Sequence, residues 1–246
     1  MSSLEGKAVL VTGGSRGIGA AIAMRAAAEG AAVALTYNRS PEQARKVVRS
    51  IEEAGGKAFA LYADVADPES VSSVVDQAAA RLGGLDILVN NAGIFPYGMI
   101  DEFTLEDYEN TMAIHTRSVF VAVQAALRHI GEGGRIISIG SSLVERIPYP
   151  GISLYAMSKS ALVGFTKGLA RDLGPRGITA TVVHPGSTDT EMNPADGDGA
   201  DEERALTALG RYATANDIAA TVVHLAGPGG AYITGTAITV DGGVTA

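Results

Sequence analysis

The sequence predicts a single α/β domain in which a parallel sheet of seven strands is covered by helices on both faces. Short, nearly continuous apolar runs alternate with amphipathic segments of helical length along the chain, as in sheets buried on both sides. The 246 residues suffice for one domain with a full core. No internal repeat or low-complexity linker divides the chain, so we assign residues 1–246 to one domain.

Seven apolar runs are the candidate strands, because residues that favour β structure dominate them. A segment of helical length follows most runs, so the strands are expected to be parallel. The candidate strands are Lys7–Thr12, Ala32–Tyr37, Lys57–Ala63, Leu85–Asn90, Arg135–Gly140, Ile178–Val183 and Ala237–Val240.

Six amphipathic segments are the candidate helices. Two of them begin with a capping residue followed by a proline at the first helical position, Ser40-Pro41 and Asp67-Pro68. The candidate helices are Gly17–Glu29, Pro41–Ala54, Pro68–Leu82, Thr104–Ile130, Ser153–Leu173 and Thr214–Ala226.

Residues 187–210 interrupt the alternation with a polar, acidic stretch that is rich in glycine. Long irregular segments of this kind are typical of lids and binding loops, so we expect a substrate lid here. A disordered surface insertion is the alternative. Together with residues 94–100 and 143–154, the lid is expected to form the substrate pocket.

Composition and charge exclude several classes of protein. The chain has 27 acidic and 19 basic residues and no basic cluster, which argues against a nucleic-acid partner. Without cysteine it can form no disulfide or thiolate metal site, and its four histidines lack a ligand spacing, so no metal is expected. Neither a signal peptide nor an apolar run of about 20 residues is evident. We therefore expect a cytoplasmic protein without a membrane partner.

A glycine-rich loop follows the first candidate strand and opens the first candidate helix. Such a loop lets backbone N–H groups approach a pyrophosphate, and the helix N-terminus adds partial positive charge. The placement favours a dinucleotide site on a Rossmann-type, doubly wound sheet over a plain β–α turn. The residues expected at the cofactor are Gly13, Ser15, Arg16, Gly17, Ile18 and Gly19.

The loop spacing Gly-x-x-x-Gly-x-Gly, preceded by Thr12, resembles that of the short-chain dehydrogenase/reductase family. Further motifs of this family occur in the right order over nearly the whole chain, including Asn90-Asn91-Ala92-Gly93 and Tyr155-x-x-x-Lys159. The resemblance implies an acidic residue beside the adenine and backbone contacts along the dinucleotide. It assigns these contacts to Asp64, Val65, Asn91, Ala92, Gly93, Pro185, Gly186, Thr188 and Thr190.

The end of the second strand indicates which nicotinamide cofactor binds. Sites specific for NAD place an acidic residue there to hold the ribose 2′-hydroxyl. This chain instead has Tyr37-Asn38-Arg39-Ser40, and Arg16 lies in the glycine loop. Two guanidinium groups suit a 2′-phosphate, so the sequence predicts NADP(H). The alternative is that Arg39 is a solvated residue at a helix start.

Tyr155 and Lys159 are four residues apart on one predicted helix and therefore share a face. An ammonium beside a phenol favours the phenolate, so Lys159 is expected to lower the Tyr155 pKa from about 10. The resemblance implies that Tyr155 gives a proton to a carbonyl oxygen during reduction. It also implies that Lys159 holds the nicotinamide ribose, that a serine polarises the carbonyl, and that the cofactor supplies hydride.

Two residues are candidates for that serine. Counting thirteen residues back from Tyr155 indicates Ser142, whereas the register of the fifth strand indicates Ser141. We prefer Ser141, because burial fixes the register of a strand while loops vary in length.

His115 occupies the position where many members of the family carry an asparagine that anchors a proton-relay water. Imidazole can hydrogen-bond to water, so we include His115 among the catalytic residues as a substitute relay. A weakened relay and a buried structural histidine are the alternatives.

The leading function is an NADPH-dependent oxidoreductase that reduces a ketone or 3-oxo group to a secondary alcohol, similar to 3-oxoacyl-carrier-protein reductases and carbonyl reductases. The acidic lid favours a small neutral carbonyl substrate. The alternative is a nucleotide-binding regulator with little turnover, similar to a cyclic-di-GMP-binding subgroup of the family. The resemblance also implies a homotetramer assembled through the helices at 104–130 and 153–173, whose apolar stripes could equally face the core.

Overall fold

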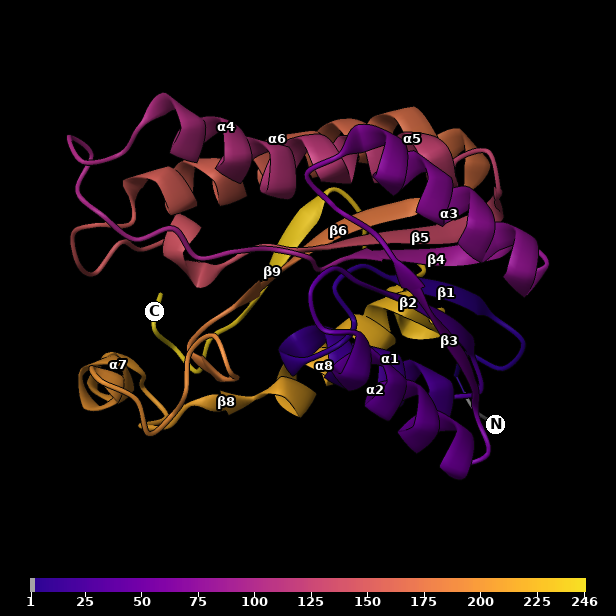
Figure 1. Ribbon diagram of the computed structural model, residues 1–246, viewed down its shortest axis with the longest axis horizontal. Helices are drawn as coiled ribbons and strands as arrows, with labels where there is room; N and C mark the ends of the chain where they lie inside the picture. Colours follow the sequence, from indigo (N-terminus) through magenta and orange to yellow (C-terminus); the bar gives the residue numbers. More distant parts are fainter. Residues whose placement is uncertain (1–2) are drawn as a thin grey trace.

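A seven-stranded parallel sheet forms the centre of the computed structural model, which describes residues 3–246 (Figure 1). The strand order is β3-β2-β1-β4-β5-β6-β9. The chain therefore builds outward from β1 in one direction, returns to the centre, and builds outward in the other. The strands are β1 (Ala8–Val11), β2 (Ala32–Tyr37), β3 (Lys57–Tyr62), β4 (Leu85–Asn90), β5 (Ile130–Ile139), β6 (Thr179–Pro185) and β9 (Thr236–Val240). This is the doubly wound, Rossmann-type sheet that the sequence predicts.

Helices cover both faces of the sheet (Figure 1). One layer packs through a core cluster below the sheet in Figure 1, and the other packs through a second cluster above it. The lower layer contains α1 (Gly17–Ala28), α2 (Pro41–Glu53) and α8 (Ala215–Ala226); the upper contains α3 (Pro68–Leu82), α4 (Leu105–Met112), α5 (Ser118–Ala126) and α6 (Ser153–Leu173).

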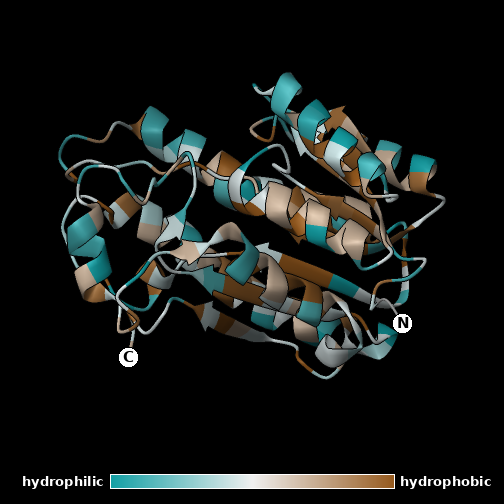
Figure 2. Cartoon of the chain, turned by 90° about the horizontal axis from the view of Figure 1, so that it is seen from below, coloured by the Kyte–Doolittle hydropathy of each residue, from teal (hydrophilic) through white to brown (hydrophobic). Residues whose placement is uncertain are grey.

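Successive side chains of a strand pack alternately into the two core clusters, because they point to opposite faces of the sheet. In β1, Val9 and Val11 join the lower cluster while Leu10 joins the upper one, and all three are at most 1% exposed. Figure 2 shows apolar residues concentrated on the strands and polar residues on the outward faces of the helices. This burial explains why the strands read as continuous apolar runs.

The two predicted helix starts behave differently. The Asp67 carboxylate accepts hydrogen bonds from the N–H groups of Glu69 and Ser70, so it caps α3 as expected. The Ser40 side chain makes no such bond to the first turn of α2. Proline at the first helical position is therefore the main local signal for α2.

The predicted continuous helix over Thr104–Ile130 is wrong in two respects. It is interrupted by a π turn over Ala113–Arg117, and the helical part ends at Ala126. A π turn contains an extra residue, and it occurs here at the buried His115. The predicted strand Arg135–Gly140 is also too short, because β5 begins at Ile130, which pairs with Leu85 before an irregularity in the register. The remaining strand boundaries differ from prediction by at most two residues.

The predicted lid, residues 187–210, is more regular than expected. It contains the short helix α7 (Ala200–Leu206), and β7 (Thr188–Asp189) pairs in parallel with β8 (Ala213–Thr214). Figure 1 places α7 and β8 together, beyond the ends of the central strands and close to the C-terminus. Within residues 3–246, none of the helices has the length and apolar character needed to cross a membrane.

Candidate functional site

The glycine loop between β1 and α1 is packed so tightly that side chains are excluded. A Cβ at Gly13 would lie 2.9 Å from the Ala92 Cα, and Gly13 has a positive φ of 65°. A Cβ at Gly19 would lie 2.3 Å from the Gly13 carbonyl oxygen. No side chain of the described residues caps the first turn of α1, so its N–H groups remain available to an anion.

Asn91 and Thr12 connect the glycine loop to the end of β4. The Asn91 side-chain amide donates to the carbonyl oxygens of Thr12 and Gly13, each at 3.0 Å. In return, the Thr12 hydroxyl accepts from the N–H groups of Asn91 and Ala92 at 2.9 and 3.2 Å. The Asn-Ala-Gly motif therefore fixes the loop from the neighbouring strand, at the switch point between β1 and β4 where doubly wound folds bind ligands.

A cavity of about 690 Å³ runs along this edge of the sheet. Its lining includes every cofactor-binding residue predicted from the sequence, from the glycine loop through Tyr37, Asn38, Arg39 and Ser40 to Thr188 and Thr190. Ser141, Ser142, Tyr155 and Lys159 line it as well. The structure thus brings the predicted cofactor-binding residues and the Ser-Tyr-Lys group together at a single surface, from several loops and from α6.

The end of the cavity beside β2 carries the features expected around an adenosine 2′-phosphate. Arg16 and Arg39 are both exposed, and neither forms an ion pair within residues 3–246. The Asp64 carboxylate accepts from the Ala66 N–H at 3.0 Å and from the Asn38 amide at 3.4 Å. Two unpaired guanidinium groups and a carboxylate already bonded within the protein suit an added anion better than a bare ribose hydroxyl.

Lys159 and Tyr155 project from α6 at the other end of the cavity. Lys159 is 5% exposed, and its Nζ donates to the Ile139 carbonyl oxygen at 2.9 Å. Burial lowers the pKa of Lys159 to about 8. The Lys159 Nζ is 5.9 Å from the centre of the Tyr155 ring, so the two groups are neighbours without a direct hydrogen bond.

The expected effect on the Tyr155 pKa is not what the structure shows. Burial raises the pKa of the Tyr155 phenol above its ordinary value, and the group that opposes this is the nearby Ser141 hydroxyl, not Lys159. The prediction that Lys159 lowers this pKa was wrong for the protein alone. Burial lowers the Lys159 pKa to about 8, below the ordinary pKa of a phenol, so Lys159 has largely lost its charge at the pH at which Tyr155 would ionise, and desolvation dominates.

The geometry distinguishes the two candidate serines. Ser141 follows β5 in an extended conformation, and its hydroxyl lies close enough to Tyr155 to affect that pKa. Ser142 instead begins a 3-10 turn over Ser142–Val144. The Ser141 hydroxyl also accepts from the Leu143 N–H at 3.2 Å, which orients it. The structure therefore favours Ser141 as the partner of Tyr155.

His115 lies behind the cavity and does not line it. Its Nε2 accepts a hydrogen bond from the Ile94 N–H at 3.0 Å, so the proton of the neutral ring must be on Nδ1. The Nδ1–H donates to the Ser158 hydroxyl at 2.8 Å, and that hydroxyl donates to the Tyr155 carbonyl oxygen at 2.7 Å. His115 thus joins the loop after β4 to the turn of α6 that carries Tyr155.

The surroundings keep the His115 ring neutral. The ring is 1% exposed, and burial together with the nearby Lys159 charge lowers its pKa to about 3. Both ring nitrogens are bonded to protein groups, which leaves neither for a relay water. The structure thus offers a bridging role for His115 in place of the predicted relay.

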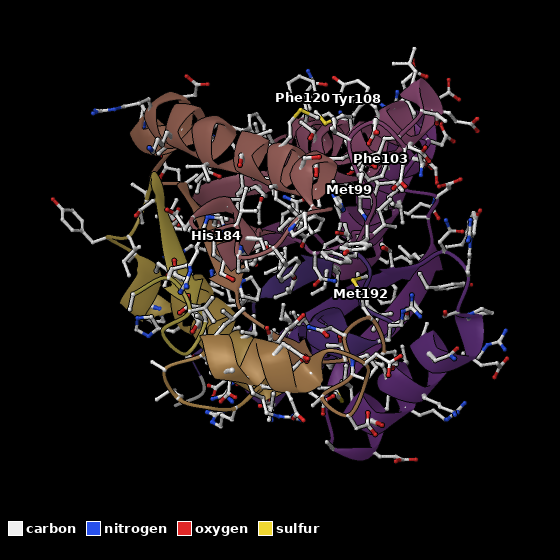
Figure 3. The ribbon with its side chains drawn as sticks, turned by 90° about the vertical axis from the view of Figure 1, so that its left-hand side faces the viewer. Met99, Phe103, Tyr108, Phe120, His184 and Met192 are labelled. Carbon is white, nitrogen blue, oxygen red and sulfur yellow. The ribbon has the colours of Figure 1, made fainter. Side chains whose placement is uncertain are left out.

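Sequence reasoning did not single out the aromatic wall of the cavity. The Phe95 ring meets the Tyr155 ring edge-on at 4.8 Å and stacks with Tyr97 at 6.5 Å. Tyr149 and Met192 also line the cavity. Figure 3 shows Met99 and Phe103 in the upper half of that view and Met192 below them. Apart from Phe103, these residues lie in the segments expected at the substrate pocket, but single side chains in loops carry no spacing signal.

Together, the doubly wound sheet, the glycine loop and the Ser-Tyr-Lys group define a dinucleotide-binding oxidoreductase fold. The sequence model of a family described as Enoyl-(Acyl carrier protein) reductase matches residues 13–245. The chain belongs to the short-chain dehydrogenase/reductase family.

Three relatives show how widely the similarity extends. A short-chain dehydrogenase of Burkholderia cenocepacia J2315, solved in complex with NADP, is 59% identical, with a TM-score of 0.97 over 99% of this chain and 100% of that one. A blue fluorescent protein from a metagenomic library, in complex with NADPH, is 55% identical, with a TM-score of 0.97 and the same coverage. The cyclic-di-GMP-binding biofilm dispersal mediator protein of Escherichia coli strain K12 is 43% identical over 98% of each chain.

The two solved relatives hold the cofactor that the sequence predicts for this chain, NADP(H). The name of the third relative corresponds to the alternative function considered above, a nucleotide-binding regulator. The family shows that the protein is an oxidoreductase of the short-chain type.

Proposed function

We propose that this protein is an NADPH-dependent reductase that converts a ketone or 3-oxo group to a secondary alcohol. The observation that carries the proposal is the meeting of Ser141, Tyr155 and Lys159 at the inner end of the dinucleotide cavity. These groups supply a hydrogen-bond donor, a proton donor and a cation at one place, which is what carbonyl reduction requires.

The chain's own residues divide the work at the carbonyl oxygen. The Ser141 hydroxyl donates a hydrogen bond to that oxygen, and the Tyr155 hydroxyl gives it a proton as negative charge develops. Burial raises the Tyr155 pKa, so the phenol carries its proton at neutral pH when the substrate binds. Lys159 supplies positive charge beside the tyrosine and would hold the nicotinamide ribose. Bound NADPH supplies the hydride.

We assign the cofactor as NADP(H) on the fit of the cavity. The glycine loop excludes side chains where the pyrophosphate approaches, and α1 offers uncapped N–H groups there. Arg16 and Arg39, which form no ion pair among residues 3–246, lie at the end where a 2′-phosphate would be held. NADP and NADPH in the two solved relatives support the same assignment.

The substrate pocket favours a neutral carbonyl compound with an apolar body. Phe95, Tyr149 and Met192 provide aromatic and apolar contacts around Tyr155. Among the described residues, the charged side chains that line this part of the cavity, beyond Lys159, are Glu191 and Glu203. Carboxylates there repel an anionic substrate, so a small neutral ketone or diketone fits better than an acyl group on an acidic carrier protein.

A second candidate function is nucleotide-dependent regulation with little turnover, as the name of the Escherichia coli relative suggests. The occupation of both His115 nitrogens by protein groups favours it, since no substitute relay is then formed at this position. The complete Ser141, Tyr155 and Lys159 group argues for catalysis instead. Cyclic-di-GMP binding without turnover of any carbonyl compound would favour the regulator.

We also propose that the protein assembles with copies of itself, as the family resemblance implies. An apolar groove on the outer face of the upper helical layer is lined by Tyr108, Met112, Phe120 and Phe165. The Phe120 ring is 50% exposed and packs against Phe165 at 6.0 Å (Figure 3 shows Phe120 beside Tyr108 at the outer edge). Exposed aromatic surface of this kind is typical of subunit interfaces.

The test is NADPH oxidation with a panel of ketones, 3-oxo esters and diketones, followed by the absorbance of the reduced nicotinamide. NADH and the Tyr155→Phe variant run in parallel, because phenylalanine keeps the ring contact with Phe95 and removes only the hydroxyl. Turnover that is lost in the variant supports the reductase. Tight NADPH binding with equal rates in both proteins would refute the assigned role of Tyr155.

A further inference from the structure

His184 is a fully buried polar side chain near the site that the proposed reaction does not use. It is the penultimate residue of β6 and is 0% exposed. Its ring fills the space beside Gly140, where a Cβ would lie 2.3 Å from His184 Nδ1. The sequence around the end of β5 is therefore adapted to this imidazole: a larger residue than glycine at position 140 would displace it.

The ring holds the backbone of the proposed catalytic serine. The Ser141 N–H donates to His184 Nδ1 at 2.9 Å. The paired register of β5 and β6 ends at Ile139 and Val183, and the Gly140 N–H still reaches the Val183 carbonyl at 2.8 Å. Ser141 is thus the first residue beyond the ladder, and the imidazole provides the acceptor that its N–H requires.

The hydrogen bond also fixes the tautomer. Nδ1 accepts a hydrogen bond from the Ser141 N–H, so a neutral ring must carry its own proton on Nε2. Burial lowers the pKa of His184 and keeps the ring neutral. Nε2 has no hydrogen-bond partner within residues 3–246, and the nearest carboxylate oxygen, on Glu145, is 3.9 Å away.

An unpartnered buried N–H is unfavourable, so an apolar side chain of similar size would serve better if the position only needed filling. The benefit of imidazole here must come from Nδ1, which meets Ser141. His184 approaches the serine through its main chain, whereas the Ser141 hydroxyl is oriented separately by the Leu143 N–H. Two independent hydrogen bonds therefore set the direction of the hydroxyl toward Tyr155.

We propose that His184 is a positioning residue for carbonyl reduction: its Nδ1 holds the Ser141 backbone so that the serine hydroxyl meets the carbonyl oxygen beside Tyr155. The inference rests on the proposed function, since Ser141 matters only if a carbonyl is bound there. His184 touches neither the substrate nor the cofactor in this role. Its loss should therefore lower kcat and leave NADPH binding unchanged.

The test compares His184→Leu with His184→Asn, using the best carbonyl substrate of the wild-type protein. Leucine fills the space but has no acceptor, and we expect kcat to fall by about 10- to 100-fold through misplacement of Ser141. Asparagine offers Oδ1 near the position of Nδ1, and we expect kcat within about threefold of wild type, since the acceptor is restored. In both variants the NADPH dissociation constant, measured by fluorescence, should stay within about twofold, as neither change touches the phosphate sites.

A double-mutant cycle separates positioning from general packing. In a Ser141→Ala background, His184→Leu should cost little further activity, because the group that it positions is already absent. Equal kcat for wild type and His184→Leu would overturn the proposal, as would equal losses in the Leu and Asn variants or full additivity with Ser141→Ala.

A measurement on the wild-type protein does not depend on the folding of any variant. Nitrogen NMR of the histidine-labelled protein should show His184 as a neutral ring protonated on Nε2 and unprotonated on Nδ1. The opposite tautomer would overturn the proposal. Absence of wild-type turnover on every carbonyl compound would refute the proposed function itself, whichever tautomer is found.

Discussion

Acidification should destabilise this protein through His115, and the effect can be isolated with one substitution. The pKa of His115 is about 3 in the folded protein and 6.5 in the reference state. Between these values the unfolded chain binds a proton that the folded protein does not. The stability that depends on the neutral ring is therefore present above about pH 6.5 and is lost as the pH falls toward about 3.

The size of the effect follows from the two pKa values and the burial of the ring. His115 is 1% exposed, so solvent screening is small. Each pH unit below 6.5 costs about 1.36 kcal/mol, which gives about 3 kcal/mol by a pH of about 4.5. Protonation would also place a second proton on Nε2, where it would face the Ile94 N–H and break that hydrogen bond.

The assay is urea unfolding of the wild type and of His115→Asn, followed by circular dichroism from pH of about 7 to about 4.5 at one protein concentration. Asparagine can form hydrogen bonds and does not titrate. The other acidic and basic groups are shared, so their contributions cancel in the difference. We expect the unfolding free energy of the wild type to fall by about 3 kcal/mol more than that of the variant. Parallel curves for the two proteins would refute the reasoning.

Three further predictions concern the site and the surface. Lys159→Met should abolish turnover yet stabilise the protein at neutral pH by up to about 2 kcal/mol. The reason is that an apolar chain replaces a buried ammonium with a pKa of about 8, and only one hydrogen bond is lost. A melting temperature below that of the wild type would contradict this prediction. Arg39→Ala should weaken NADPH binding by about tenfold and leave NADH binding unchanged, as measured by fluorescence titration. An equal loss of affinity for both cofactors would contradict a contact between Arg39 and the 2′-phosphate. Phe120→Glu should dissociate the proposed homo-oligomer, so light scattering that gives equal masses for variant and wild type would exclude this groove as an interface.

The sheet and the cofactor cavity could be predicted because burial and close approach leave direct marks in a sequence. The apolar run AVLV of β1 is possible only where both faces are covered, and its four residues are all buried. Gly13 and Gly19 occupy positions where a Cβ would meet backbone atoms at 2.9 and 2.3 Å. Such positions tolerate one residue type, so the spacing of the glycines, together with their place between a strand and a helix, identifies the loop.

The π turn and the electrostatics of the site could not be predicted, because they depend on contacts between distant segments. Nothing in Ala113–Arg117 breaks a helix locally; the extra residue accompanies the contacts of His115 with Ile94 and Ser158, 21 and 43 residues away in sequence. The Tyr155 pKa likewise depends on how completely the phenol is enclosed. Sequence spacing places Lys159 near Tyr155 but cannot show whether charge or desolvation dominates.

The choice between Ser141 and Ser142 shows how the two kinds of information combine. Strand register placed Ser141 at the end of β5, and the structure adds the His184 acceptor that holds it there. Both histidines accept a hydrogen bond from a backbone N–H: His184 from that of Ser141, and His115 from that of Ile94. His115 reaches the Tyr155 turn through its other nitrogen, which donates to the Ser158 hydroxyl. Both backbone hydrogen bonds require an unprotonated ring nitrogen, and burial lowers the pKa of both histidines. The relative placement of serine and tyrosine thus depends on two rings that burial keeps neutral, so an acceptor, more than a proton carrier, is what each position demands.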